Sequence, residues 1–119
     1  MKIAVTSKGT QLSSEVDPRF GRAAYILIVD ADSLAFEILD NHENVNAFKG
    51  AGIQAATMIA DRGAEVLLTG YCGPNAFRTL EAADIKVGNY TAGTVEEAIN
   101  HFKKGGVSFS ESANAEGHW

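Results

Sequence analysis

Short apolar runs separated by polar stretches predict several strands along this chain. Lys2–Thr6 and Glu65–Thr69 have the length of buried strands, and Ala24–Asp30 (AYILIVD) is nearly continuous, which is typical of a central strand. Ala35–Asp40 alternates apolar and polar residues after a turn-like stretch, so we expect it to form a hairpin with the preceding strand. Ile85–Asn89 is the last predicted strand.

Apolar residues recur at helical spacing in three further segments. Ala51–Arg62 is predicted to be a helix that ends at Gly63, and Pro74–Ala83 begins with a proline, which suits the first turn of a helix. The last helix is the clearest, because Thr94 and Glu97 form a capping-box pattern before an apolar face. That face follows the spacing i, i+3, i+4, i+7 and consists of Val95, Ala98, Ile99 and Phe102.

The resulting order β, ββ, α, β, α, β, α predicts one α/β domain with a mixed sheet. The β-α-β units imply parallel neighbours with right-handed crossovers, whereas the hairpin adds an antiparallel strand. Ligands bind beyond the carboxyl ends of strands in such sheets, and those ends lead into Ser7–Arg22, Thr69–Asn75 and Asn89–Thr94. We expect residues 1–104 to form the domain, and residues 105–119, which lack periodicity, to form a flexible tail.

Composition and charge narrow the class of protein. A chain of 119 residues with 45% hydrophobic and 21% charged residues suits one soluble domain. Its net charge of −5 disfavours nucleic-acid binding, which uses a basic surface. No apolar run has the length of a signal peptide or a membrane span, so we expect a soluble cytoplasmic protein without membrane partners. We also expect a monomer that does not bind nucleic acid.

The chain has one cysteine and three histidines, which excludes ordinary thiolate metal sites built from this chain alone. Iron–sulfur and structural zinc sites need several thiolate or imidazole ligands. The histidines, His42, His101 and His118, are scattered without ligand spacing, and we expect each of them at the surface.

The loop VDPRFGR places two arginines where a ligand is expected. Arg19 and Arg22 flank Phe20 in a chain with only ten basic residues, and the guanidinium fork suits anion recognition. In the alternative interpretation, Asp17 and Glu15 pair with the arginines and Phe20 fills the core. The residue pattern leaves both interpretations open.

Two helix starts offer further candidate contacts. Lys49, Gly50 and Gly52 lie at the start of the first helix, where free backbone amides favour an anion and glycines permit close approach. Cys72 lies between a strand end and the next helix start, where the helix dipole lowers the pKa of a thiol. In the alternative interpretation, Cys72 is a small apolar residue packed against the sheet.

Familiar catalytic arrangements find little support in the sequence. No serine lies in a G-x-S-x-G elbow, and Cys72 has no identifiable His–Asp partner. A two-metal nuclease needs acids on the first strand, and KIAVT contains none. A hydrolase is therefore the least supported hypothesis.

The motifs VDPRFGR and G-x-x-GPNAF-x-x-L together resemble the nitrogenase iron–molybdenum cofactor accessory family, of the NifX and NifB C-terminal type. The likeness covers Met1 to Phe102, and within the family the chain is most similar to the small orange proteins of sulfate-reducing bacteria. The resemblance implies an RNase H-like, three-layer α/β fold. Such a fold has a mixed five-stranded sheet with one antiparallel strand and helices on both faces.

The resemblance also implies a non-enzymatic role, in which the protein binds or carries a preformed anionic cluster. The cluster is a molybdenum–copper sulfide or, alternatively, the iron–molybdenum cofactor or its precursor. The positions carried over by motif are Arg19, Phe20, Arg22, Lys49, Gly50, Gly52, Tyr71, Gly73 and Asn75, with Cys72 as a candidate metal contact.

One departure from the family pattern favours holding the cluster by charge, since many relatives have histidine where this chain has Lys49. Many relatives also have an aliphatic residue where this chain has Cys72, so we expect Cys72 to be specific to its subgroup. The competing hypothesis is a scaffold for a larger cytoplasmic complex. Its contact would be the tail, through Phe109 and Trp119.

Overall fold

The computed structural model describes residues 1–45, 50–89 and 91–111, and its five strands form one mixed sheet. The sheet order is β3-β2-β1-β4-β5. β1 is antiparallel to β2 and parallel to β4, so β2 runs against the other described strands, as expected for one antiparallel member. The strands are β1 (Lys2–Ser7), β2 (Tyr25–Asp30), β3 (Phe36–Asp40), β4 (Val66–Leu68) and β5 (Lys86–Gly88).

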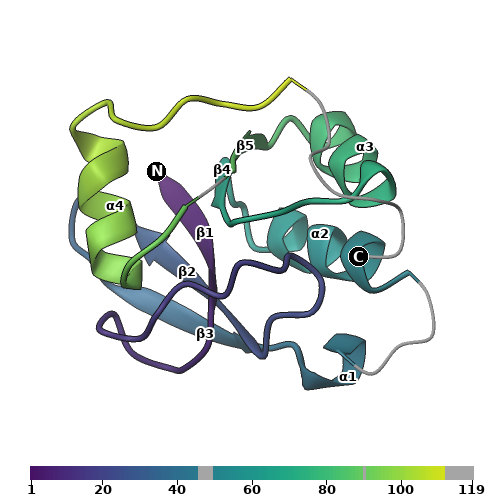
Figure 1. Cartoon of the computed structure of the whole chain (residues 1–119), viewed down its shortest axis with the longest axis horizontal. Helices are drawn as coiled ribbons and strands as arrows, with labels where there is room; N and C mark the ends of the chain where they lie inside the picture. Colours follow the sequence, from purple (N-terminus) through teal and green to yellow (C-terminus); the bar gives the residue numbers. More distant parts are fainter. Residues whose placement is uncertain (46–49, 90, 112–119) are drawn as a thin grey trace.

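Helices cover both faces of the sheet, which gives the three expected layers. Figure 1 shows α4 on one side and α2 and α3 on the other. These helices are α2 (Ala51–Asp61), α3 (Pro74–Ala82) and α4 (Val95–Lys103). The short helix α1 (His42–Val45) lies between the predicted hairpin and the first predicted helix, where the sequence pattern predicted no element. None of the described helices is long and apolar enough to cross a bilayer.

Side-chain alternation along the central strands divides the core into two parts. Ala4 packs in the cluster with α2 and α3, whereas its neighbours Ile3 and Val5 pack in the cluster with α4. The same alternation holds in β2, where Ile26 faces the first cluster and Leu27 the second. A strand covered on both faces needs apolar residues at every position, which explains the continuous run in β2.

The capping box predicted at α4 is present in the structure. The Thr94 hydroxyl accepts from the Glu97 backbone N–H (3.1 Å), and a Glu97 carboxylate oxygen accepts from the Thr94 backbone N–H (3.0 Å). This second hydrogen bond lowers the pKa of Glu97, because the ionised carboxylate is the better acceptor. The N–H groups of Val95 and Glu96 donate to the carbonyls of Ser14 and Leu12, so side chains and a neighbouring loop together satisfy this helix start.

The first part of the predicted tail lies against the sheet edge. Phe109 forms a bridge with Gly88, and the Ser110 backbone N–H donates to the Val87 carbonyl (2.8 Å). The Asn89 side-chain amide donates to the Ser110 hydroxyl (2.6 Å). The segment 106–110 is therefore attached to β5 by backbone and side-chain contacts. Residues 112–119, with His118 and Trp119, lie outside the described residues.

Candidate functional site

The structure brings the arginine loop and the Tyr71 turn together at the carboxyl edge of the sheet. The Tyr71 backbone N–H donates to the Pro18 carbonyl (2.6 Å), and the Phe20 N–H donates to the Tyr71 carbonyl (3.1 Å). Arg19 and Tyr71 form a parallel bridge between these hydrogen bonds. Two segments about fifty residues apart in the sequence thus act as one surface.

Glycines allow this loop to approach both of its neighbours closely. A Cβ atom on Gly70 would lie 2.7 Å from backbone atoms of Pro18. Gly21 has φ +93°, and a Cβ atom there would lie 2.8 Å from the backbone nitrogen of Gly52 in α2. The loop is therefore packed between the Tyr71 turn on one side and the start of α2 on the other.

Buried polar residues that we did not single out in the sequence hold the loop in place. The Thr6 hydroxyl donates to the Asp17 carbonyl (2.6 Å) and lies 2.8 Å from the Thr69 hydroxyl. The buried Asn41 amide donates to two carbonyl oxygens of the same connection, those of Gly21 and Ala23. Thr6 and Thr69 each follow an apolar run, and a polar side chain at that place was the available signal.

The arginine loop contains both an ion pair between Arg19 and Asp17 and an arginine side chain that is partly exposed. The Arg19 Nε lies 3.5 Å from the buried Asp17 carboxylate, and about half of the Arg19 side chain stays exposed. Glu15 pairs with Lys8 instead (3.3 Å). The Arg22 backbone N–H donates to the Arg19 carbonyl (3.1 Å), so the two arginines share one tight turn.

Phe20 has a different place from the one expected of a cluster contact. Its side chain is 0% exposed and belongs to the core cluster under α2 and α3. The exposed aromatic surface at this edge comes from Tyr71 instead, which is 39% exposed. Phe20 therefore anchors the loop, and its ring lines the core rather than the outer surface.

The helices α2 and α3 begin beside this loop without a side-chain cap among the described residues. Gly50 precedes α2 with φ +81°, and Gly73 precedes α3 in an extended conformation. Gly52 is buried against the loop, while Asn75 is exposed and its side-chain oxygen accepts from Arg78. Uncapped first-turn amides are donors for an anion. Lys49 lies outside the described residues.

The environment of Cys72 distinguishes the two interpretations of this residue. The side chain is fully buried in the cluster with α2 and α3, and its Sγ lies 3.7 Å from the Gly73 carbonyl oxygen. Burial raises the pKa of the Cys72 thiol to about 12, which is the opposite of the lowering that an exposed helix start would cause. Of the two interpretations left open by the sequence, the space-filling one fits this structure.

We expect native Cys72 to be inert toward thiol reagents. Because the folded pKa is about 12 against a reference value of 9.0, the thiol stays protonated in the folded state at mildly alkaline pH. The unfolded chain loses this proton first, so this contribution to stability is complete below pH 9.0 and declines as the pH rises toward about 12. A colorimetric disulfide reagent should react only after guanidinium is added. Rapid labelling of the folded protein would contradict the buried thiol.

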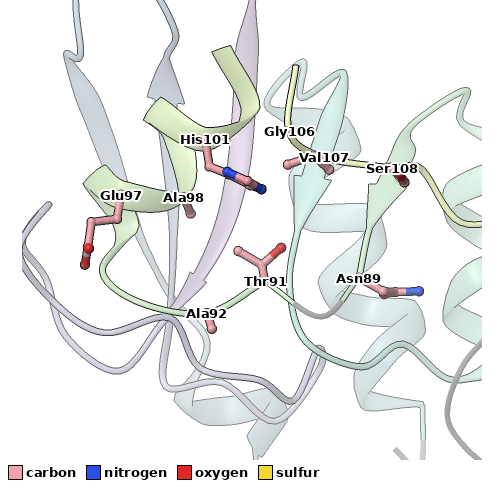
Figure 2. Close-up of a pocket in the computed structure, with 9 residues that line it drawn as sticks. All are labelled: Asn89, Thr91, Ala92, Glu97, Ala98, His101, Gly106, Val107 and Ser108. Carbon is pink, nitrogen blue, oxygen red and sulfur yellow. The ribbon is translucent and has the colours of Figure 1, made fainter. Parts of the chain in front are cut away.

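A cavity that we did not predict from the sequence lies at the same edge, beside α4. It has a volume of about 620 Å³ and is bounded by α4, by Asn89, Thr91 and Ala92, and by residues 106–108. Figure 2 shows the His101 ring and the Thr91 side chain pointing toward one another across it, and Glu97 is also among the residues that line it.

Cations and hydrogen-bond donors gather at this edge together with the carboxylates of Asp17, Glu15 and Glu97. Among residues 1–45, 50–89 and 91–111, no three His, Cys, Asp or Glu side chains lie close enough together to hold a metal ion. Arg19 and Arg22, the first-turn amides of α2 and α3, and the Tyr71 ring suit a ligand that is anionic and partly apolar.

Known proteins of similar sequence and structure share this fold. The orange protein of Desulfovibrio gigas, in its apo form, has 48% sequence identity and a TM-score of 0.93, with 96% of each chain covered. A NifB-like protein from Thermotoga has 36% identity and a TM-score of 0.83, with 98% of each chain covered. The protein MJ0580 of Methanocaldococcus jannaschii is 29% identical over 108 residues, which cover 88% of this chain and 87% of that protein.

The match to a family model covers nearly the whole domain. The model described as "Dinitrogenase iron-molybdenum cofactor" matches residues 1–105, which include the arginine loop, both uncapped helix starts and the cavity residues as far as α4. The chain therefore belongs to the dinitrogenase iron–molybdenum cofactor family.

Proposed function

We propose that this protein binds and carries a preformed anionic metal–sulfur cluster at the carboxyl edge of its sheet, without acting as an enzyme. The cargo is a molybdenum–copper sulfide or a related iron–molybdenum species. Membership of the iron–molybdenum cofactor family supports the cluster class, and the similarity to an orange protein favours the first of the two. The protein holds the cluster through noncovalent contacts.

The observation that carries the proposal is the convergence of the arginine turn with two uncapped helix starts. A cluster that brings its own sulfides does not require a full set of protein thiolates. It requires positive potential, hydrogen-bond donors and some apolar surface. Arg19 and Arg22, the first-turn N–H groups of α2 and those that follow Pro74 in α3, and the exposed face of Tyr71 provide these within one edge.

Reconstitution of the apo-protein tests this proposal. Tetrathiomolybdate and copper added together should give visible charge-transfer bands at a fixed stoichiometry, and the colour should comigrate with the protein on gel filtration. The double variant Arg19→Gln/Arg22→Gln should weaken binding at least about tenfold, since a hydrogen bond to a charged group contributes about 1.5–3 kcal/mol.

Arg62→Gln is the matched control for this experiment. Arg62 pairs with Glu37 on the side of β3 and is exposed, so its loss removes a cation without touching the carboxyl edge. If the wild type, the double variant and Arg62→Gln all load the cluster equally, the arginine turn is not part of the binding site. A wild-type protein that retains no colour after gel filtration would overturn the cluster-binding function. Metal analysis of protein from its native host would distinguish the two cargo classes.

The scaffold alternative has weaker support in the described residues. The ring of Phe109 packs 6.1 Å from that of Phe102, and the Lys86 ammonium lies 5.7 Å from the centre of the Phe109 ring. Phe109 thus has contacts within its own chain. A pull-down with and without residues 105–119 would separate the two hypotheses, since loss of a partner on truncation favours the scaffold.

A further inference from the structure

The cavity beside α4 lies close to the arginine turn on the carboxyl edge. One of its walls is α4, and the opposite wall is the segment 106–108, which precedes the residues attached to β5. A second cavity of about 400 Å³ shares Thr91, Ala92 and Glu97 with it and reaches Pro18 in the arginine loop. The two cavities therefore adjoin each other and lead from α4 to the loop that carries Arg19.

Glu97 and Thr91, which line both cavities, present hydrogen-bond acceptors. The Glu97 carboxylate accepts from the Thr94 backbone N–H, and no item of charge opposite to it lies within ion-pair distance among the described residues. The same hydrogen bond lowers the pKa of Glu97, so the carboxylate is ionised at neutral pH. The Thr91 hydroxyl donates to the Gly88 carbonyl (3.1 Å), so only its lone pairs remain for a ligand.

Asn89 adds a third acceptor to the lining. Its side-chain amide donates to the Ser110 hydroxyl (2.6 Å), whereas its buried Oδ1 has no hydrogen-bond partner among the described residues. A buried carbonyl oxygen without a donor is unfavourable until a donor reaches it. The His101 ring faces Thr91 across the space and lies against Gly106, where a Cβ atom would be 2.3 Å from the ring Cε1 (Figure 2).

This lining suits a positively charged group on an apolar stem. No lysine or arginine is among the described residues that line the cavity beside α4, and Lys8 in the adjoining cavity pairs with Glu15 (3.3 Å). A lysine side chain carries N–H donors and no acceptor at the end of an apolar stem. Ala98 and Val107 supply apolar wall for such a stem, and a volume of about 620 Å³ is ample for it.

The charge of the cargo indicates where such a lysine comes from. A protein that takes over an anionic cluster needs positive potential at its own binding site. Two cationic surfaces repel each other as they approach, so docking on the arginine turn requires carboxylates and other acceptors beside it. Glu97, Thr91 and Asn89 are placed there. We infer that the cavity beside α4 receives a basic side chain of the protein that exchanges the cluster with this one. This inference rests on the proposed function and names the chemistry of its partner.

Two capped tripeptides test this docking role, acetyl-Gly-Lys-Gly-amide and its norleucine counterpart, which have similar stems and differ in charge. They are titrated into the full apo-protein at mildly alkaline pH, where histidine side chains are ordinarily neutral. The lysine peptide should shift the methyl NMR signals of Thr91, Ala98 and Val107 more than those of Ala82 at the end of α3. The norleucine peptide should bind at least about threefold more weakly.

Glu97→Gln is the sharpest variant, because glutamine keeps the capping box and removes only the charge. It should weaken binding of the lysine peptide about threefold and leave cluster loading unchanged. Glu96→Gln is the matched control, since Glu96 is an exposed carboxylate in the same turn of α4 and does not line the cavity. It should bind the lysine peptide as the wild type does.

The outcomes separate this inference from the proposed function. Equal binding of the two peptides, or an unchanged affinity in Glu97→Gln, would overturn the docking role and leave cluster loading standing. Putrescine, a free diamine, should bind no more tightly than the lysine peptide. If it binds more tightly, the cavity is a site for free amines, and the docking role is overturned. If the wild type loads no cluster, the proposed function fails and the partner's role fails with it.

Discussion

Phe20→Ala should lower the free energy of unfolding by about 3–5 kcal/mol. The ring is fully buried in the core cluster with α2 and α3, so its removal leaves a cavity there. The backbone hydrogen bond from residue 20 to the Tyr71 carbonyl remains possible in the variant, so the change measures the contribution of the buried ring. Urea unfolding followed by circular dichroism measures the change.

Two further substitutions make this result specific. Phe36→Ala removes the same ring from an edge strand where it is 36% exposed, and it should cost about 1 kcal/mol or less. Phe20→Leu keeps most of the buried volume and should leave cluster loading unchanged, since the ring does not face the ligand. A Phe20→Ala protein as stable as Phe36→Ala would contradict the anchoring role, and loss of loading in Phe20→Leu would restore Phe20 to the binding surface.

Gly21→Ala should destabilise the protein by roughly 3–5 kcal/mol, more than any other single-methyl change that we predict. Two costs add at this position. The residue has φ +93°, where side chains are strained, and the new Cβ atom would lie 2.8 Å from the Gly52 nitrogen and 2.9 Å from its Cα. Backbone atoms cannot rotate away as a side chain does, so the loop or α2 must move.

Gly50→Ala separates these two costs. Gly50 has a similar φ of +81°, but no atom lies within 4 Å of a Cβ atom built there. It should therefore carry only the conformational strain, about 1–2 kcal/mol. Thermal or urea unfolding of both variants gives the comparison. Equal destabilisation would mean that the close approach between the loop and α2 contributes nothing.

Much of the fold follows from sequence patterns because local signals and tertiary packing agree. The run AYILIVD predicts β2 because both of its faces are covered, and Thr94 with Glu97 predicts the start of α4 because the cap is made within the segment. The helix α1 was not predicted, since one turn is too short to show a period.

The candidate site was predictable where it depends on topology and unpredictable where it depends on burial. Strand ends and crossovers place Arg19 and Tyr71 at one edge, and the structure joins them. The state of Cys72 depends on how completely α2 and α3 exclude water, which spacing along a chain does not reveal. The cavity beside α4 exists because residues 106–110 return to β5, and the alternation in G-V-S-F-S is too short to have predicted that pairing.

The two borders of the sheet have different consequences for self-association. At β5, Phe109 and Ser110 already occupy the hydrogen-bonding row that a second molecule would use. At the other border, β3 exposes Ile38 but also carries Glu37 and Asp40, and charged side chains on a terminal strand discourage strand addition. Truncation after α4 would therefore uncover the less charged edge of the sheet. We expect such a shortened protein to aggregate at a lower concentration than the full chain does.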